Sequence, residues 1–510
     1  MTRTVWFASR MLILTMALSL PIAAEAQPRQ SRTNAPPAQQ QQPEPKREGI
    51  LRLLPADAVT GHSITLANGK SVNYTATAGT LALYDQSGDQ SAAVFYTAYV
   101  AKRTDDTPRP LTFGFNGGPG AASAYLHLGL VGPKILQFGD RNDAATAQLR
   151  ANPETWLEFT DIVMIDPVGS GWSRAAKPDG GDAFRGVRRD TDFFAKVIAL
   201  YVAKNARTRS PKYLLGESYG GFRAAKVARA LQQDQGVAVS GIVMVSPLLE
   251  GAFTFGGDRF ALGAALYLPS LVAAELDRTG KMSREALAEA ERFALTEYLS
   301  TLAGAAPKGE AARAFYAKVA RMTGIPEDDV TRSRGFLRDY YVKNLRSADG
   351  MVVSRYDGSF GMDDPFPGSR GDRAPDPVLD GFTRAYSGAF VGYAREELGF
   401  HTDMTYVLLA GTGNWEWREG GRGEPGVSDD LRVLLAYNPS FRLMIAHGHS
   451  DLVTPHMASR YVLDHLPPVT QPERAQFKLY SGGHMFYIAD EPRRNFTADM
   501  KAFYNPGKGW

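Results

Sequence analysis

The hydrophobic positions of this chain fall into short apolar runs that are separated by turn residues and by longer stretches with helical spacing. Apolar runs of this length predict strands that are buried on both faces, as the strands of parallel sheets are. They lie at 111–115, 213–215, 241–245, 442–446 and 477–480, with earlier β-rich segments around 59–66 and 92–100. A helical pattern at 457–466 predicts one crossover helix between the last two strands. These patterns indicate an α/β protein with a mostly parallel central sheet flanked by helices.

The pattern becomes helical after the strand at 241–245. From about 251 to 346 the apolar residues recur at helical spacing. Ser283 precedes an alanine-rich amphipathic stretch that runs through Leu302, and we expect its hydroxyl to cap that helix. Another helix is expected around 311–322. This block of helices predicts a cap domain inserted into the α/β core.

The cap is followed by a segment rich in Gly, Pro and Asp at 355–376, which predicts a long irregular loop beside the active cleft. We therefore expect the cap with this loop to occupy 251–395. The core would then consist of a first part at 50–250 and a second part at 396–510.

The N-terminus has the pattern of an export signal. Arg3 and Arg10 precede the apolar stretch 11–24, and small residues follow, so residues 1–26 are expected to be a cleaved signal peptide. The alternative is a membrane anchor, but the apolar stretch is shorter than the roughly 20 residues that span a bilayer. Residues 27–49, rich in Gln, Pro and Arg, predict a disordered linker. We expect a secreted or periplasmic protein without stable membrane insertion.

The composition is that of a large globular protein. Hydrophobic residues make up 44% of the 510 residues and aromatic residues 11%, which is ample for a large buried core. The formal net charge of +3 is small for this length and does not indicate a nucleic-acid partner. The chain has no cysteine, so disulfides cannot stabilise it. Its oligomeric state is not legible from composition.

The strongest chemical signal is a G-x-S-x-G motif formed by Gly216, Ser218 and Gly220. It follows the predicted strand at 213–215 and precedes a helical pattern at 222–228. A strand that turns sharply into a helix lifts the serine hydroxyl above the sheet edge, and glycines on either side avoid a steric clash. Ser218 is therefore the candidate nucleophile.

A serine nucleophile needs a base and an acid that orients this base, in the chain order Ser, Asp, His for this class of elbow. Asp451 follows the predicted strand at 442–446, and His484 follows the next strand at 477–480. Both residues would then lie at the carboxyl ends of neighbouring parallel strands, where open sheets form their ligand crevices. No other histidine lies one strand and one crossover beyond Asp451; the others are His62, His127, His401, His447, His449, His456 and His465.

A metal site is the alternative explanation of the same loop. His447, His449 and Asp451 form an H-x-H-x-D run at a strand end, and these side chains are common metal ligands. That explanation leaves Ser218 and His484 without a role, whereas the triad uses Asp451 and treats the two loop histidines as ordinary polar residues. We therefore expect neither a metal nor an organic cofactor.

A second glycine-rich motif predicts an oxyanion hole. The strand at 111–115 ends in the sequence Asn-Gly-Gly-Pro-Gly at 116–120. Tetrahedral oxyanions are stabilised by two backbone N–H groups, one from the residue after the nucleophile and one from a loop after an early strand. The expected donors are Tyr219 and Gly118. A simple turn is the alternative reading of these five residues.

The motifs resemble, in order and spacing, those of the serine carboxypeptidases, from about residue 80 to the C-terminus. They are Asn116-Gly117-Gly118-Pro119-Gly120, Gly132-Pro133, Asn152-Pro153 with Trp156, Asp166-Pro167-Val168-Gly169-Ser170-Gly171, Gly216 to Gly221, and Gly483-His484-Met485. The chain is identified as a member of that family, of a bacterial, secreted type. The resemblance implies an α/β-hydrolase fold with an inserted helical cap and a catalytic triad of Ser218, Asp451 and His484.

The resemblance also implies a site for the free C-terminal carboxylate of a peptide. Asn116 and Glu217 match the family positions that hold this group. A glutamate beside a substrate carboxylate must share a proton with it, so such a site favours acidic pH. The chain departs from the family at Leu130, where members usually carry a second glutamate. Whether carboxylate recognition survives this change is left open.

The function that these signals predict is a secreted serine carboxypeptidase that acts on peptides through an acyl-enzyme intermediate. An esterase or acyltransferase with the same triad is the first alternative, because relatives of this family carry out such reactions. A non-catalytic binding protein on a hydrolase fold is a remote alternative, since every expected catalytic group is present.

Overall fold

The structure is a computed structural model that describes residues 47–103, 105–139, 144–255, 257, 259–368, 375–418, 424–467 and 471–505. The predicted signal peptide at 1–26 lies outside these residues, and so does the predicted linker up to residue 46. Both stay predictions.

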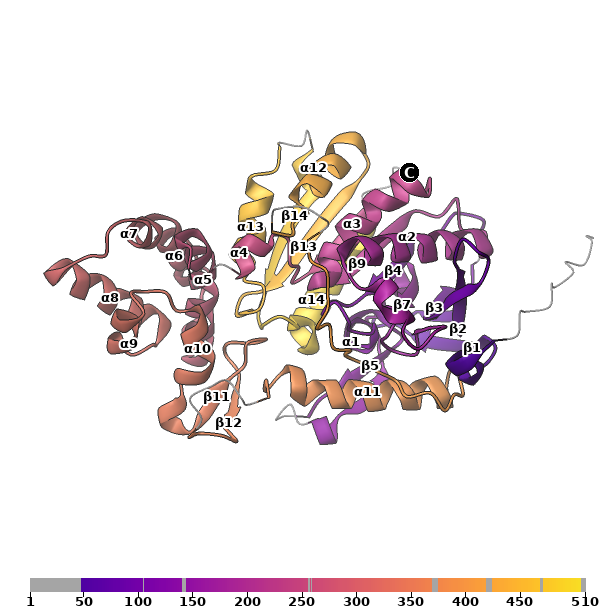
Figure 1. Cartoon of the computed structure of the whole chain (residues 1–510), viewed down its shortest axis with the longest axis horizontal. Helices are drawn as coiled ribbons and strands as arrows, with labels where there is room; N and C mark the ends of the chain where they lie inside the picture. The colour runs from indigo at the N-terminus through magenta and orange to yellow at the C-terminus, as the bar shows by residue number, and fades with distance from the viewer. Residues whose placement is uncertain are drawn as a thin grey trace, which may run out of the picture. The chain divides into compact units, whose positions relative to one another are not determined.

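A ten-stranded sheet crosses the core (Figure 1). Its order is β1 (Ala58–Thr65), β2 (Ser71–Tyr84), β3 (Gln90–Ala101), β7 (Asp161–Ile165), β4 (Leu111–Phe115), β9 (Lys212–Glu217), β10 (Gly241–Val245), β13 (Arg442–Gly448) and β14 (Ala475–Tyr480), while β8 (Arg174–Ala175) pairs with β3. Neighbours from β7 to β14 are parallel, whereas β1, β2, β3 and β8 pair in antiparallel fashion. Every predicted strand is present, and β2 and β7 were not predicted. A small hairpin of β5 (Lys134–Gln137) and β6 (Gln148–Ala151) lies apart from this sheet.

Helices cover both faces of the sheet, which explains why its central strands are largely apolar and are buried at every position. Successive side chains of β10 point to opposite faces, so Ile242 and Met244 join one hydrophobic cluster and Val243 and Val245 join the other. The first of these two clusters is completed by α2 (Val187–Lys204), α3 (Tyr219–Asp234), α12 (Ser428–Tyr437) and α13 (His456–Asp464). The second is completed by α1 (Ala124–Leu126), α11 (Leu379–Glu396) and α14 (Asp490–Tyr504).

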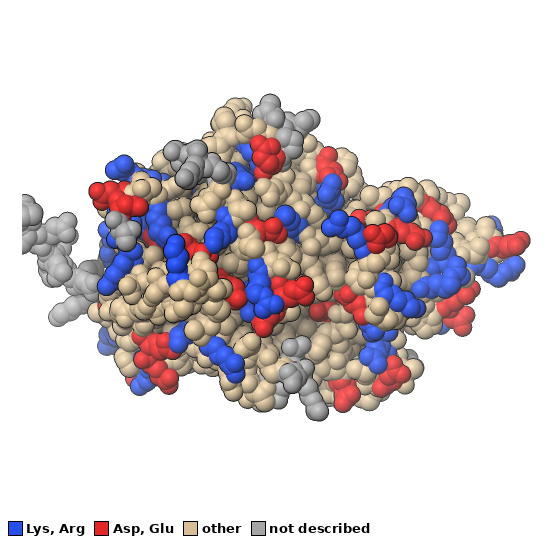
Figure 2. All heavy atoms as spheres, turned by 180° about the vertical axis from the view of Figure 1, so that it is seen from behind, with Lys and Arg blue, Asp and Glu red and all other residues tan. Residues whose placement is uncertain are grey.

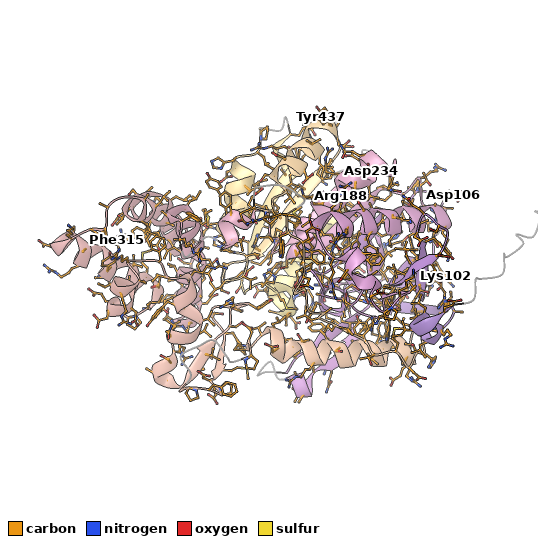
Figure 3. The ribbon with its side chains drawn as sticks, in the orientation of Figure 1. Lys102, Asp106, Arg188, Asp234, Phe315 and Tyr437 are labelled. Carbon is orange, nitrogen blue, oxygen red and sulfur yellow. The ribbon has the colours of Figure 1, made fainter. Side chains whose placement is uncertain are left out.

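The inserted cap is helical and has a hydrophobic cluster of its own, in which Phe315 is labelled in Figure 3. Its helices are α4 (Gly251–Phe255), α5 (Ala261–Arg278), α6 (Arg284–Phe293), α7 (Leu299–Ala303), α8 (Gly309–Thr323), α9 (Glu327–Arg332) and α10 (Arg338–Asn344). The Ser283 hydroxyl accepts a hydrogen bond from the Ala286 N–H at 3.1 Å, as a cap of α6 does. The single helix expected through Leu302 is instead interrupted by a π-helical segment, Ala294–Tyr298.

The described residues of the segment 355–376 are irregular, as predicted, except for one short strand. That strand, β12 (Gly361–Asp363), pairs with β11 (Met351–Val353), which precedes the segment. Helix α11, which begins inside the expected cap range of 251–395, packs into the core cluster through Phe382 and Tyr386 rather than into the cap cluster. The exact domain boundaries stay predictions.

The surface carries both signs of charge. Basic and acidic side chains are interspersed over the face drawn in Figure 2. Among the described residues, no helix combines the length and the apolar character needed to cross a bilayer.

Candidate active site

Ser218 occupies the turn between β9, which ends at Glu217, and α3, which begins at Tyr219. Its backbone has φ 61° and ψ −126°, a conformation that serine rarely adopts and that the surrounding contacts must hold in place. The glycines of the motif are sterically required. A Cβ on Gly216 would overlap the Gly220 carbonyl, and a Cβ on Gly220 would lie 2.6 Å from the Phe115 oxygen. The local sequence therefore determines where the hydroxyl is presented.

Asp451 and His484 lie side by side at the ends of β13 and β14. The Asp451 Oδ2 is 2.8 Å from the His484 Nδ1, and both side chains are buried. The Asp451 carboxylate also accepts hydrogen bonds from the Val453 N–H at 2.8 Å and from the Thr454 N–H at 3.1 Å. Burial by itself would lower the pKa of His484, but the charge and the hydrogen bond of Asp451 raise it above its ordinary value.

Ser218 and His484 line the same cavity, which has a volume of about 360 Å³. The His484 ring is in edge-to-face contact with Tyr356, with ring centroids 5.2 Å apart. Within the described residues, the Ser218 hydroxyl makes no hydrogen bond to His484. Such contacts are often long in a protein without substrate and shorten when substrate binds. The cavity thus brings Ser218 and His484 together, and Asp451 contacts His484, so the three residues expected to form a triad are neighbours.

The loop that carries Gly118 lies against the elbow. A Cβ on Gly117 would be 2.6 Å from the Tyr219 nitrogen, so only glycine allows this approach. The Gly117 carbonyl accepts a hydrogen bond from the Ala121 N–H at 2.9 Å. Because the C=O and N–H of a trans peptide point in opposite directions, this bond turns the Gly118 N–H away from Ala121. Gly118 and Tyr219 both line the cavity beside Ser218.

Arg223, on the first turns of α3, holds the same loop from behind. Its guanidinium donates to the carbonyls of Asn116 at 2.6 Å and Pro119 at 2.8 Å, which lie on either side of the two glycines. It also forms a two-bond ion pair with Asp190 at 2.7 and 3.1 Å, and both side chains are buried. Arg223 was not singled out from the sequence. The available signal was a cation on an otherwise apolar face of the helix that follows the nucleophile.

Asn116 and Glu217 are hydrogen-bonded to each other inside the cavity. The Asn116 Nδ2 donates to Glu217 Oε2 at 3.0 Å, and the Asn116 Oδ1 accepts from the Leu126 N–H at 3.1 Å, which orients the amide. Burial raises the pKa of Glu217 to about 7, although His484 and two hydrogen bonds act in the opposite direction. Leu130, which stands where the family usually has a second glutamate, is fully buried in the core cluster.

The side chains of the H-x-H-x-D run have different hydrogen-bond partners, although His447 Nδ1 also lies 4.0 Å from Asp451 Oδ2. His447 Nε2 lies 2.9 Å from the Ser459 hydroxyl, His449 Nε2 lies 2.5 Å from Asp277 of the cap, and Asp451 contacts His484. In the part of the chain that the structure describes, no group of three or more such side chains is arranged to hold a metal ion.

The cap completes the cavity wall and contacts the triad loop. Leu452, next to Asp451, packs into the cap's hydrophobic cluster, and its carbonyl accepts from the Tyr267 hydroxyl at 2.8 Å. Thr254 of α4 and Arg338 of α10 line the cavity from the cap side. Arg338 forms no hydrogen bond or ion pair with a described residue, and its closest ring contact is Tyr267, 6.0 Å from the ring centroid. The cap therefore contributes a cation to the cavity.

Comparison with known proteins explains the combination of an elbow, an early glycine loop and a buried Asn–Glu pair. Residues 69–251 match the family described as serine carboxypeptidase. This part of the chain is similar to the serine carboxypeptidase family. The matched range contains Ser218, Gly118, Asn116 and Glu217, whereas Asp451 and His484 lie beyond it.

Curated proteins are similar to this chain over a limited stretch. Serine carboxypeptidase-like 41 of Arabidopsis thaliana is 27% identical over 172 residues, which are 31% of this chain and 34% of that protein. Carboxypeptidase sxa2 of Schizosaccharomyces pombe is 26% identical over 161 residues, covering 31% of this chain and 29% of that protein. The chain thus matches about a third of the length of these relatives.

A solved structure extends the similarity at the level of fold. The crystal structure of Kex1(delta)p, a prohormone-processing carboxypeptidase from Saccharomyces cerevisiae, aligns with a TM-score of 0.53 and 15% identity. The alignment covers 85% of this chain and 91% of that structure. At this identity the comparison concerns the fold alone, and the predicted α/β-hydrolase fold is confirmed.

Proposed function

We propose that this protein is a serine carboxypeptidase that releases C-terminal residues from peptides through an acyl-enzyme intermediate. The observation that carries the proposal is the shared cavity: Ser218, His484 and the Asn116–Glu217 pair all line it, and Asp451 is hydrogen-bonded to His484. A nucleophile alone would suit many hydrolases. A buried acid within the same cavity supports a substrate that ends in a carboxylate.

In the proposed mechanism, Ser218 attacks the carbonyl carbon of the last peptide bond. His484 accepts the hydroxyl proton at Nε2, because its Nδ1 is already engaged by Asp451, and then donates it to the leaving nitrogen. The N–H groups of Gly118 and Tyr219 stabilise the oxyanion. Water, activated by the same imidazole, then hydrolyses the ester and restores the serine.

Recognition of the substrate's carboxylate depends on the protonation of Glu217. Burial raises the pKa of this acid to about 7, so it is neutral in acid and can donate a hydrogen bond to the carboxylate. Above that pH the ionised Glu217 and the substrate's carboxylate would both be negative and would repel each other. Preference for a free C-terminus should therefore be strongest in acid and decline as the pH rises through neutrality. We also propose that the enzyme acts after export, which the N-terminal pattern supports.

The test is the hydrolysis of two peptides that differ only in a free or an amidated C-terminus, followed by mass spectrometry from acidic to alkaline pH. We expect removal of one residue at a time from the free form only, and no turnover by Ser218→Ala. Labelling with a fluorophosphonate should likewise depend on Ser218. Equal cleavage of both peptides, or cleavage of simple esters alone, would contradict the proposal and indicate a broader hydrolase or acyltransferase.

A further inference from the structure

The buried Glu217 has a second hydrogen-bond donor that the sequence motifs do not include. The hydroxyl of Tyr487 donates to Glu217 Oε2, the same oxygen that accepts from Asn116. Tyr487 lies three residues after His484, in a 3₁₀ turn (Phe486–Ile488), and is fully buried. The loop that carries the catalytic histidine therefore also carries a partner for Glu217.

The two carboxylate oxygens of Glu217 differ in their hydrogen bonding. Oε2 accepts two hydrogen bonds, whereas Oε1 accepts none from any described residue, and Glu217 lines the catalytic cavity. The Asn116 amide cannot rotate to offer an acceptor, because its own oxygen is held by the Leu126 N–H. A proton bound to Glu217 is thus best placed on Oε1, the oxygen that remains available to a ligand.

The space for Tyr487 is provided by the segment in which the family's second glutamate is missing. A Cβ on Gly129 would lie 2.6 Å from the Cε2 atom of the Tyr487 ring, so a larger residue at this position would displace the ring. The neighbouring Leu130 is buried in the core cluster. This segment accommodates the tyrosine and contributes no acid of its own.

We infer that Tyr487 takes the place of the missing second acid, and that by donating to Oε2 it directs the acidic proton of Glu217 through Oε1 to the C-terminal carboxylate of the substrate. Tyr487 is in this sense a positioning residue, and the inference rests on the proposed carboxypeptidase function. The ligand class is a peptide with a free α-carboxylate. A tyrosine is neutral throughout the working pH range, so in the Tyr487–Glu217 pair only Glu217 titrates. Two neighbouring glutamates would instead titrate together and share a proton.

Other groups around Glu217 also influence its proton. The titratable side chains that shift its pKa are His484, Tyr487 and Asp451. The neutral tyrosines Tyr386, Tyr125 and Tyr356 lie near it, and Tyr219, Arg338 and Arg355 line the same cavity. Among them, Tyr487 and His484 favour the ionised form of Glu217, whereas Asp451 opposes it. Loss of the Tyr487 hydroxyl should therefore raise the pKa of Glu217 further.

The test compares wild-type protein with Tyr487→Phe, which removes one oxygen atom and keeps the ring. We expect kcat/KM for the free peptide to fall roughly tenfold, the equivalent of one lost hydrogen bond to a charged or acidic group, mainly through KM. Hydrolysis of an activated ester without a carboxylate should be unchanged. The pH at which free-carboxylate preference disappears should move upward.

Tyr386→Phe is the matched control. The Tyr386 hydroxyl is buried near the same segment, and it has no hydrogen-bond partner among the described residues. Its removal should leave the preference unchanged. A fluorophosphonate labelling rate equal to that of wild type would show that Tyr487→Phe keeps its triad intact.

The outcomes separate the inference from the proposed function. If wild-type protein cleaved free and amidated peptides equally, the proposed function would fail, and the role of Tyr487 with it. If wild type discriminated but Tyr487→Phe discriminated just as strongly, only the role of Tyr487 would be overturned. An equal decrease of kcat/KM for the peptide and for the ester would also overturn the role of Tyr487, because such a decrease would indicate a general structural effect.

Discussion

Arg223 shows how a single side chain can maintain the geometry of a loop that it reaches from a distant part of the chain. Four donor contacts of its guanidinium are divided between Asp190 and the two carbonyls that flank Gly117 and Gly118. The planar guanidinium also lies 4.4 Å from the ring centroid of Phe194. Lysine could supply the charge but not this fork of donors. The loop's N–H groups therefore depend on the shape of Arg223 as well as on its charge.

We predict that Arg223→Lys lowers kcat by roughly a hundredfold, comparable to the loss of an oxyanion donor, while KM changes little. Arg223→Met should in addition destabilise the fold by about 3–5 kcal/mol, because it leaves Asp190 buried and unpaired. Steady-state kinetics and urea unfolding measure the two effects. Arg229→Met on the same helix is the control, since its ion pair with Asp430 is long and partly exposed. An unchanged kcat in Arg223→Lys would contradict the role of Arg223.

At the scale of elements, the cap and the loop after β13 are joined by several polar contacts. His449 contacts Asp277 of α5, His456 Nε2 lies 3.0 Å from Glu291 of α6, and the Tyr267 hydroxyl donates to Leu452. These contacts place the cap on the loop that carries Asp451. The cap helices thereby bring Arg338 to the wall of the catalytic cavity.

We predict that Arg338 makes the enzyme favour peptides with an acidic side chain near the scissile bond. Arg338, which has no described partner, would form an ion pair with an acidic side chain of the substrate in a partly desolvated cavity. About 1.4 kcal/mol of such attraction gives a tenfold preference for the acidic peptide. Arg338→Met should abolish the preference and Arg338→Glu should invert it toward basic side chains. Competition between otherwise identical peptides with Glu or Gln measures the effect.

The control for this prediction is Lys318→Met, which removes a cap cation that pairs with Glu297 and does not line the cavity. It should leave the choice between the two peptides unchanged. Identical selectivity in wild type and Arg338→Glu would rule out a role for Arg338 in substrate choice.

At the scale of the whole molecule, burial of Glu217, the acid proposed to bind the substrate's carboxylate, lowers the stability of the fold. Folding raises the pKa of Glu217 from 4.5 to about 7 because the side chain is buried. The folded state therefore holds this proton more tightly than the unfolded chain does. Stability is highest below the unfolded pKa, declines as the pH rises, and reaches its reduced level above about pH 7. The buried acid in the cavity therefore reduces the stability of the whole fold at neutral and alkaline pH.

We predict that Glu217→Gln is more stable than wild type above pH 7, by on the order of 3 kcal/mol, and that the difference disappears below pH 4.5. Urea unfolding midpoints measured across this pH range provide the check. The exposed Glu289→Gln is the control and should show no such trend. A variant that is less stable than wild type at alkaline pH would contradict the cost assigned to burial of Glu217.

The sequence by itself determined the parts of this protein that depend on local sterics and on burial. Gly216 and Gly220 allow the strained turn at Ser218, and short apolar runs bounded by turn residues favour strands that are covered on both faces. The crossover helix between β13 and β14 predicts that these two strands are parallel neighbours, so Asp451 and His484 could be expected at one sheet edge. The interruption of the cap helix and the packing of α11 could not be predicted from the sequence, because tertiary contacts override local periodicity at both places.

Only the tertiary structure decided which distant side chains meet. Arg223 reaches Asp190 and the carbonyl groups of the glycine loop, and Tyr487 reaches Glu217 through a gap left at Gly129. These partners are far apart in the chain, and no spacing rule relates them. Their contacts form because a close-packed interior satisfies most buried polar groups from whichever element lies within reach. Motif positions can therefore be read from the chain, whereas the residues that orient them depend on packing.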